Sequence, residues 1–255
     1  MRSPRGLDPK DYPLSGAGPS SDLFPWQAVV DDRNVQGATA VAVPGVVSGM
    51  GLAHERYGRK PWRELVQPAV QLAQQGLLVD WYSGLVTASS ARALSQDPHA
   101  AAMFLDEGTW PIMGSWTSTT PRRLDQRALA VSLQHIADEG PRALYEGSLA
   151  RALAQDVQAK GGCLAEADLA AYQAQWVDPL TVAYRGGHLH AAPGLTGGPT
   201  FAQALGLLEQ TFEPGGRGAD ARAYEALART LAAAFRTRLS EMGDHESSKA
   251  PGCTT

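Results

Sequence analysis

The pattern of apolar residues changes at Pro44. Residues 1–43 are rich in Pro, Gly, Ser and Asp and show no sustained period, so we expect extended, loop-rich chain with one short strand at ATAVAV, residues 38–43. Beyond Pro44, apolar side chains recur at helical spacing. The positions that carry this spacing are Val46, Met50, Ala53 and Tyr57. They predict a helix over this segment.

A glycine and two prolines divide the next segment. Gly58 is suited to end the first helix and Pro61 to begin a second over residues 61–76. Pro68 lies inside this second helix, where it lacks the N–H of an internal hydrogen bond. It should therefore kink the helix or split it into two short ones.

Further apolar stripes predict four more helices, which follow a loop-rich connector with aromatic anchors over residues 97–116. In chain order, the stripes are Leu129, Leu133 and Ile136; Leu149, Leu153 and Val157; Leu205 and Leu208; and Tyr224, Leu227, Leu231 and Phe235. A short helix entering a strand is expected over 166–176. Residues 180–193 alternate as a hairpin, with Gly186–Gly187 suited to the positive φ of a two-residue turn. The chain is expected to be helix-rich with little sheet.

Bulk composition excludes some classes of function. The 255 residues carry a formal net charge of −4, a sequence pI near 5.9 and a mean hydropathy of −0.22. There is no basic excess of the kind that nucleic-acid binding requires, and no apolar run approaches the roughly 18 to 20 residues that span a bilayer. The N-terminal residues lack the apolar core of a secretory signal. The compartment is left open by these properties.

Single motifs carry little chemistry. His188 and His190 lie two apart in a predicted strand and would share a face, but no third ligand at metal-site spacing accompanies them. Cys163 and Cys253 show neither CxxC nor zinc-finger spacing and are expected to be unpaired thiols. The glycine clusters lack the order of a phosphate-binding loop. We therefore expect neither a metal site nor a bound cofactor.

The order of several longer segments is more informative than any single motif. Residues 40–76 contain a V-P-G turn, an H-x-R-[YH]-G helix end and the run P-W-x-x-L…P-A-x-x-L-A-x-x-G. Residues 143–172 contain L-Y-x-G-x-[LI]-A…GG-x-[LI]-x-x-x-D-L-x-x-Y. In this order, these segments resemble the gamma-glutamyltransferase (gamma-glutamyl transpeptidase) family.

Two later segments continue the resemblance in register. Residues 178–198 are similar to the family's P-[LV]…Y-R-G…P…GG segment, and residues 204–209 to its L-N-[IL]-L-E helix. The resemblance thus covers the chain from about Val41 onward. One departure is GLTGG, where many members have P-S-S-G-G. It falls where substrate-side contacts near Gly197 and Gly198 would be expected.

This resemblance implies an N-terminal-nucleophile hydrolase of the α/β (α+β) class with a four-layer αββα sandwich. Residues 1–255 would be its large-subunit part, mostly helices with a few strands. In the family, the large subunit is followed by T-[TS]-H, whose first threonine is the nucleophile. That threonine corresponds to Thr254, so we expect the precursor to be cut between Cys253 and Thr254. The small subunit and an upstream GGNAxDA-type element are expected to be missing, and the 255-residue chain to be inactive alone.

The implied reaction is γ-glutamyl transfer or hydrolysis from glutathione or a related compound, through a γ-glutamyl-threonine. The family binds the substrate α-carboxylate with an arginine in an R-x-x-P-like loop, for which Arg2 is the best match and Arg5 the runner-up. The implied partners are this small-molecule substrate and the small subunit of the same precursor. Two alternatives stay open: a non-catalytic helical scaffold or interaction fragment of the family, and a related self-processing acylase for β-lactam side chains.

Overall fold

The computed structural model describes residues 3–20, 27–114, 121–194, 196–213, 215 and 219–241. The chain forms two compact units, Met1–Gln175 and Trp176–Thr255, each with its own internal packing. The described residues are rich in helix, and their strands form four two-stranded antiparallel sheets. This agrees with the expectation of many helices and little sheet.

The N-terminal part of the first unit contains more strand than expected, and in a different place. Strands β1 (Leu14–Pro19) and β2 (Gln27–Val29) pair antiparallel, with short 3-10 helices at Pro9–Asp11 and Val30–Asp32. The strand predicted over residues 38–43 is wrong. Its first half is a 3-10 helix, Ala38–Ala40, because Gly37 enters at a φ of 74° and its carbonyl accepts from the Ala40 N–H at 3.2 Å.

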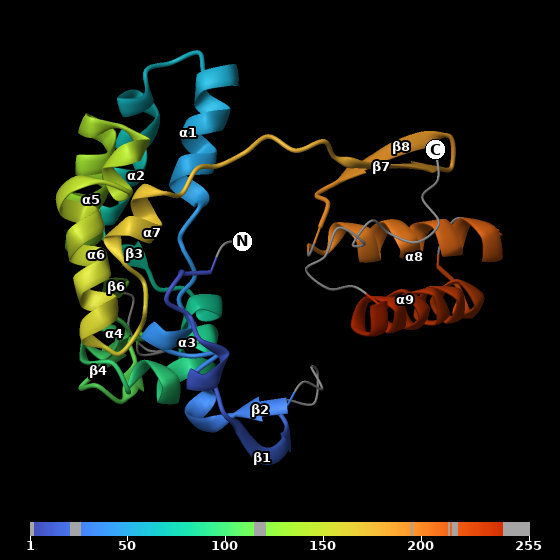
Figure 1. The fold of residues 1–255 in the computed structure, drawn as a ribbon, viewed down its shortest axis with the longest axis horizontal. Helices are drawn as coiled ribbons and strands as arrows, with labels where there is room; N and C mark the ends of the chain where they lie inside the picture. The colour runs from blue at the N-terminus through green and yellow to red at the C-terminus, as the bar shows by residue number, and fades with distance from the viewer. Residues whose placement is uncertain are drawn as a thin grey trace. The chain divides into compact units, whose positions relative to one another are not determined.

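Seven helices of the described chain belong to the first unit (Figure 1). They are α1 (Val46–Tyr57), α2 (Trp62–Gln75), α3 (Trp81–Leu94), α4 (Pro98–Phe104), α5 (Arg127–Glu139), α6 (Gly147–Ala159) and α7 (Glu166–Ala170). Two small sheets connect them: β3 (Leu77–Leu78) with β6 (Arg123–Leu124), and β4 (Leu105–Asp106) with β5 (Trp110–Pro111). A 3-10 helix, Pro141–Leu144, joins α5 to α6.

Pro68 does not split α2, contrary to one of the two expected effects. The helix runs from Trp62 to Gln75 with the proline on its exposed side. It packs against α5 and buries Val70 and Ala73 (Figure 1). The Trp62 indole N–H also donates to the Ile136 carbonyl at 2.9 Å. Tertiary packing thus offsets the hydrogen bond that a proline removes from a helix interior.

The connector expected over residues 97–116 is wrong in its first half. Helix α4 begins there because Asp97 accepts a hydrogen bond from the Ala100 N–H at 2.8 Å and Pro98 follows at the first helical position. The Lys160 ammonium lies 2.8 Å from the same carboxylate, and its hydrogen bond lowers the pKa of Asp97 to about 2. Helix α3, which we did not predict, begins at a capping box between Asp80 and Ser83.

The core of the first unit brings together segments from both halves of its sequence. Its buried residues are Val43, Tyr145, Ala150, Ala154, Val157, Leu164 and Leu169. Of the predicted stripe on α6, Val157 is buried and Leu153 packs against this core, while Leu149 is only half-buried. The buried face of α6 is centred on its alanines, because the close approach of the helix to its neighbours leaves room only for small side chains.

Three of the quoted motifs meet around Tyr145, which is fully buried. Its hydroxyl accepts a hydrogen bond from the Ser48 N–H at 3.0 Å, and its ring stacks on Tyr172 at 5.7 Å. Burial raises the pKa of Tyr145. Gly45 of the V-P-G turn lies so close to Tyr172 that an added Cβ would be 2.2 Å from the phenol oxygen. A larger residue at this position would therefore have to displace the Tyr172 ring.

The second unit is layered as hairpin, helix, helix (Figure 1). Strands β7 (Leu180–Tyr184) and β8 (Gly187–Ala191) pack on α8 (Gly198–Thr211), which packs on α9 (Ala221–Glu241). The hairpin is confirmed, but Tyr184 pairs with Gly187, so the turn residues are Arg185 and Gly186, at φ 46° and 77°. Positive φ at Arg185 is supported because its N–H donates to Glu209 Oε1 at 2.7 Å.

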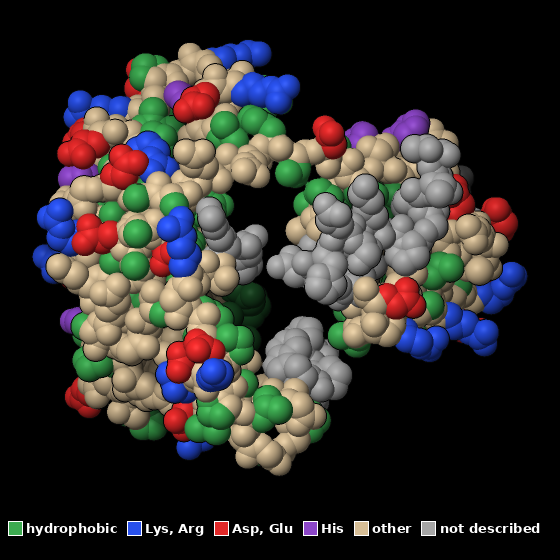
Figure 2. Space-filling model, in the orientation of Figure 1, with side chains coloured by type: hydrophobic (Ala, Val, Ile, Leu, Met, Phe, Trp, Pro, Cys, Tyr) green, Lys and Arg blue, Asp and Glu red, His purple; other side chains and the backbone are tan. Residues whose placement is uncertain are grey.

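The apolar stripe of α9 is exposed within the described residues. Thr230 and Ala234 are buried, but the larger side chains on the helix are open to solvent within the described residues. The exposed apolar residues are Tyr224, Leu227, Leu231, Phe235 and Leu239. Figure 2 shows apolar side chains reaching the surface of both units among charged ones. An apolar patch of more than a few hundred Å2 is unusual on a monomer.

We predict that the 255-residue chain binds a hydrophobic dye and self-associates through α9. Leu231→Gln with Phe235→Gln should lower dye fluorescence several-fold and shift the chain toward monomer, because glutamine keeps helix propensity and removes apolar area. Val131→Gln, at a more exposed apolar position on α5, is the control and should change neither reading. Dye fluorescence and size exclusion measure the effect. A monomer that binds no dye contradicts the prediction.

Candidate functional site

The predicted nucleophile and its processing partner lie outside the described residues. This applies to Thr254, to Cys253 and to the predicted carboxylate-binding residue Arg2. Their roles therefore stay predictions. The runner-up, Arg5, lies within the described residues. Its contacts therefore define the described part of the candidate site.

Arg5 is held by its backbone. The segment turns at Pro4, whose carbonyl accepts from the Leu7 N–H at 3.3 Å. The Arg5 N–H donates to Asp168 Oδ1 at 3.1 Å, and Arg5 Nε lies 3.9 Å from the same oxygen. The Arg5 side chain is 62% exposed, whereas that of Asp168 is 5% exposed. The main chain of Arg5 is thus anchored while its guanidinium stays open to solvent and to a ligand.

Asp168 is the functional candidate that sequence reasoning missed. It lies in the D-L-x-x-Y pattern, at the third residue of α7, and its Oδ2 accepts a hydrogen bond from the Ala165 N–H at 3.1 Å. An acidic residue in the first turn of a helix is the local signal for such a cap. Its second bond, to Arg5, spans 163 residues of sequence and has no local signal.

A small apolar pocket lies beside the segment that carries Arg5. It has a volume of about 230 Å3, and Pro4, Leu7, Tyr12 and Val41 are among the residues that line it. The Tyr12 hydroxyl donates to the Thr39 carbonyl at 2.7 Å, and burial, more than nearby charges, raises the pKa of Tyr12. The neutral phenol is thus one of the groups that line the pocket.

His190, one of the two histidines weighed for metal binding, has another partner, and so does His54. His190 Nδ1 lies 2.9 Å from Thr181 Oγ1 across the hairpin, and His54 Nε2 lies 2.7 Å from the Lys60 carbonyl. His54 also packs edge-on against Trp62 at 5.5 Å. Within the ranges that the structure describes, no group of three or more His, Cys, Asp or Glu side chains is placed to hold a metal. In the same ranges, no helix has the length and apolarity needed to cross a membrane.

The glycine segment before α8 is shaped by close packing. A Cβ on Gly198 would lie 2.0 Å from the Ala192 carbonyl oxygen. The Thr196 hydroxyl donates to that same oxygen at 2.6 Å and accepts from the Gly198 N–H at 3.1 Å. Thr196 therefore holds the turn internally in the segment where the sequence departs from P-S-S-G-G. The expected substrate contacts at Gly197 and Gly198 stay a prediction.

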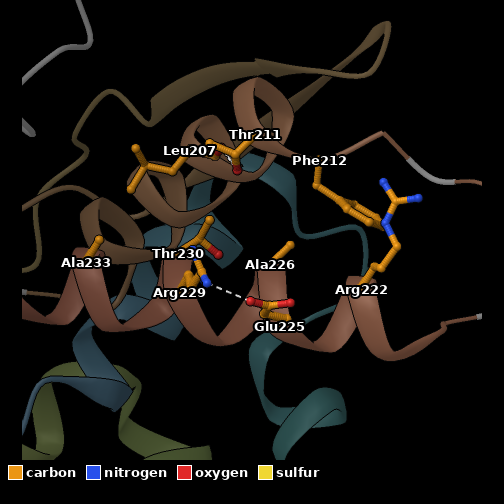
Figure 3. A pocket seen from close by; sticks show the side chains of 9 residues that line it. All are labelled: Leu207, Thr211, Phe212, Arg222, Glu225, Ala226, Arg229, Thr230 and Ala233. Atoms are coloured by element: carbon orange, nitrogen blue, oxygen red, sulfur yellow. Dashed lines mark hydrogen bonds and ion pairs between the residues drawn. The ribbon is translucent and has the colours of Figure 1, made fainter.

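An open pocket of about 420 Å3 lies between α8 and α9 (Figure 3). Leu207 and Thr211 line it from α8, and the side chains of α9 face them. Glu225 and Arg229 of α9 pair with each other across one turn at 2.7 Å. This pairing satisfies two of the charges at the pocket, and Arg222 is a third charged residue that lines it.

Comparison with known sequences gives a consistent result. A family model described as gamma-glutamyltranspeptidase matches residues 15–255. The acylase ACY 1 proenzyme of Pseudomonas sp. strain V22 is 38% identical over 223 residues, or 87% of this chain and 38% of that protein. The glutathione hydrolase proenzyme of Pseudomonas aeruginosa is 32% identical over 257 residues, or 97% of this chain and 43% of that protein. The chain thus spans less than half the length of these relatives.

Solved structures agree. Gamma-glutamyltranspeptidase from Pseudomonas nitroreducens, complexed with L-DON, has a TM-score of 0.77 at 28% identity, covering 98% of this chain and 69% of that one. The Helicobacter pylori enzyme reaches 0.79 at 23% identity, covering 95% and 65%, which supports the fold alone. These neighbours show the N-terminal-nucleophile hydrolase fold. Since the family model matches nearly the whole sequence, this chain belongs to the gamma-glutamyltranspeptidase family.

Proposed function

We propose that this chain is the large-subunit portion of a self-processing precursor whose mature form transfers or hydrolyses γ-glutamyl groups through Thr254. The observation that carries this proposal is the match of the family model through residue 255, which includes Thr254. Relatives named glutathione hydrolase proenzyme, from Pseudomonas aeruginosa and Escherichia coli, support both the reaction and the processing. Glutathione or a related γ-glutamyl compound is the proposed donor.

Processing follows from the chemistry of the threonine. The Thr254 hydroxyl attacks the carbonyl carbon of Cys253, and the acyl group passes from the Thr254 nitrogen to its oxygen. Water then hydrolyses the ester, which leaves a carboxylate on Cys253 and a free α-amine on Thr254. That amine has an ordinary pKa of about 7.7–8.0, so a useful fraction is unprotonated near neutral pH. It serves as the base that an otherwise weak hydroxyl nucleophile needs.

In the mature enzyme, the amine accepts the hydroxyl proton as Thr254 attacks the γ-carbonyl of the donor. The Thr254 α-ammonium gives this proton to the leaving amine of the donor, and the γ-glutamyl group then passes from the threonine oxygen to water or to an acceptor amine. Donors for the oxyanion that forms in each step are expected from the small subunit, and such donors are often the largest contribution to catalysis. Arg2, or Arg5 in its place, binds the donor α-carboxylate.

An acylase is the second candidate function, because the acylase ACY 1 proenzyme is 38% identical over 87% of this chain. Both candidates share self-processing at a threonine. They differ in the acyl group that the mature site accepts.

The two functions are separated by three nitroanilide donors, tested on the full-length gene product. A γ-glutamyl donor has both an α-amine and an α-carboxylate, a glutaryl donor lacks the amine, and a γ-aminobutyryl donor lacks the carboxylate. For the transferase we expect kcat/KM to favour γ-glutamyl over each of the others by about ten- to a hundred-fold, since a hydrogen bond to a charged group contributes about 1.5–3 kcal/mol. Preference for glutaryl supports the acylase. A processed protein that turns over none of the three contradicts both.

A further inference from the structure

We propose that Asp168 is a positioning residue for the substrate-binding arginine, and this inference rests on the proposed function. Its carboxylate would hold the main chain at Arg5 and so position the arginine contact proposed for the α-carboxylate of the donor. No chemical step is assigned to Asp168 itself. Its role is to determine where the arginine lies.

The contact that supports this role joins two segments far apart in sequence. Asp168 Oδ1 accepts the Arg5 N–H at 3.1 Å and lies 3.9 Å from Arg5 Nε. Asp168 is 6% exposed, so this bond forms largely out of water. A bond between a backbone N–H and a carboxylate is charge-assisted and about twice as strong as a neutral one. Arg2 lies three residues earlier on the same segment.

Asp168 is itself held rigidly. Its Oδ2 accepts from the Ala165 N–H at 3.1 Å, so both carboxylate oxygens are engaged. The next residue, Leu169, and the earlier Leu164 are fully buried in the core of the first unit. A carboxylate with this support cannot move without disturbing the core.

The other end of α7 is fastened separately by Arg142. Its Nη1 donates to the Tyr172 carbonyl at 2.9 Å and its Nη2 to the Ala170 carbonyl at 3.0 Å. Helix α7 is thus attached to the core at its C-terminal end by Arg142 and to the arginine-bearing segment by Asp168. Substitution of Arg142 or of Asp168 removes one of these attachments and leaves the other.

Loss of the Asp168 carboxylate is expected to reduce activity selectively, toward donors that carry an α-carboxylate. A displacement of about 1 Å in a group that orients the substrate can cost on the order of a hundred-fold in rate. If Asp168 only stabilised the fold, its loss would reduce the turnover of all donors alike. If it positions the arginine, the loss falls on donors that carry an α-carboxylate.

The test is Asp168→Asn in the full-length precursor, assayed with the γ-glutamyl and γ-aminobutyryl nitroanilides. Asparagine keeps the side-chain volume and one oxygen acceptor but loses the charge. We expect kcat/KM for the γ-glutamyl donor to fall about ten-fold or more, mainly through KM, and that for the γ-aminobutyryl donor to change less than about two-fold. Equal losses on both donors, or no loss on either, overturn the proposal.

Two variants serve as controls. Glu166→Gln removes a charge two residues away on α7, where the carboxylate forms only a surface pair with Arg151 at 3.8 Å, and should alter neither donor. Arg142→Met loosens the other end of α7 and should affect both donors in the same proportion. A selective loss in Arg142→Met, as large as that in Asp168→Asn, contradicts a specific role for Asp168.

A variant that fails to fold can be told apart from a failure of the proposed function. If Asp168→Asn does not fold, amide hydrogen exchange in the wild-type protein decides, because the Arg5 N–H should be strongly protected by its buried acceptor. Exchange of that amide at the rate of a free chain overturns the inference. A wild-type precursor that stays uncut, or is inactive toward all donors, overturns the proposed function and this inference with it.

Discussion

Thr254→Ala is expected to leave the full-length precursor as a single uncut chain with no measurable γ-glutamyl turnover. The alanine has no hydroxyl to attack the Cys253 carbonyl, so neither the ester nor the free α-amine can form. Loss of a covalent nucleophile lowers kcat by up to the order of a million-fold in other hydrolases. Intact-mass measurement of the wild type should give one fragment ending at Cys253 and one beginning at Thr254.

Substitutions at the neighbouring residues test whether cleavage depends on the Thr254 side chain alone. Cys253→Ala and Thr255→Ala should both be cut as the wild type is, because the reaction uses only the backbone carbonyl of Cys253 and not the Thr255 hydroxyl. Thr254→Ser should be cut as well, since serine keeps the hydroxyl. Cleavage that persists in Thr254→Ala, or that occurs at another bond, contradicts the assignment of the nucleophile.

Arg2→Ala should lower kcat/KM for the γ-glutamyl donor in the full-length enzyme by about ten- to a hundred-fold or more. The substitution would remove the proposed charge-assisted contact to the α-carboxylate, and a hydrogen bond to a charged group contributes about 1.5–3 kcal/mol. Turnover of the γ-aminobutyryl donor should change little. Steady-state kinetics on the processed enzyme measures both values.

Arg5→Ala is the matched comparison for Arg2. It removes a guanidinium from the same segment but keeps the backbone N–H that donates to Asp168. If Arg2 binds the carboxylate, Arg5→Ala should cause the smaller loss. An unchanged kcat/KM in Arg2→Ala would instead assign the role to Arg5 or to sequence upstream.

Helices α1, α2, α5, α6, α8 and α9 could be predicted from the sequence because their apolar residues recur at helical spacing. The sequence also contained the capping signals for α3 and α4, at Asp80 and Asp97, which we did not use. The strand predicted over 38–43 failed because alternation of small and β-branched residues is a weak signal beside a glycine with positive φ.

Local patterns predicted the buried face of a helix only in part, since Ile136 on α5 and Val157 on α6 are the buried members of their predicted stripes. On α5, the predicted stripe included Leu129, which is 44% exposed, whereas Ala130 and Ala137 are buried. On α9, the stripe was predicted correctly but has no covering layer among the described residues. Burial depends on how closely a neighbouring element approaches, and sequence spacing carries no information about that distance.

The sequence by itself determined the family, through the order of motifs along the chain, and it determined the candidate nucleophile Thr254 and most of the helices, which depend on residues close together in the chain. Only the tertiary structure decided that Asp168 holds the Arg5 main chain and that Pro68 leaves α2 unbroken. The physical reason is the same in both cases. The contacts that stabilise Arg5 and α2 come from segments distant in sequence, and a local period cannot encode which distant group will be within hydrogen-bonding or packing distance.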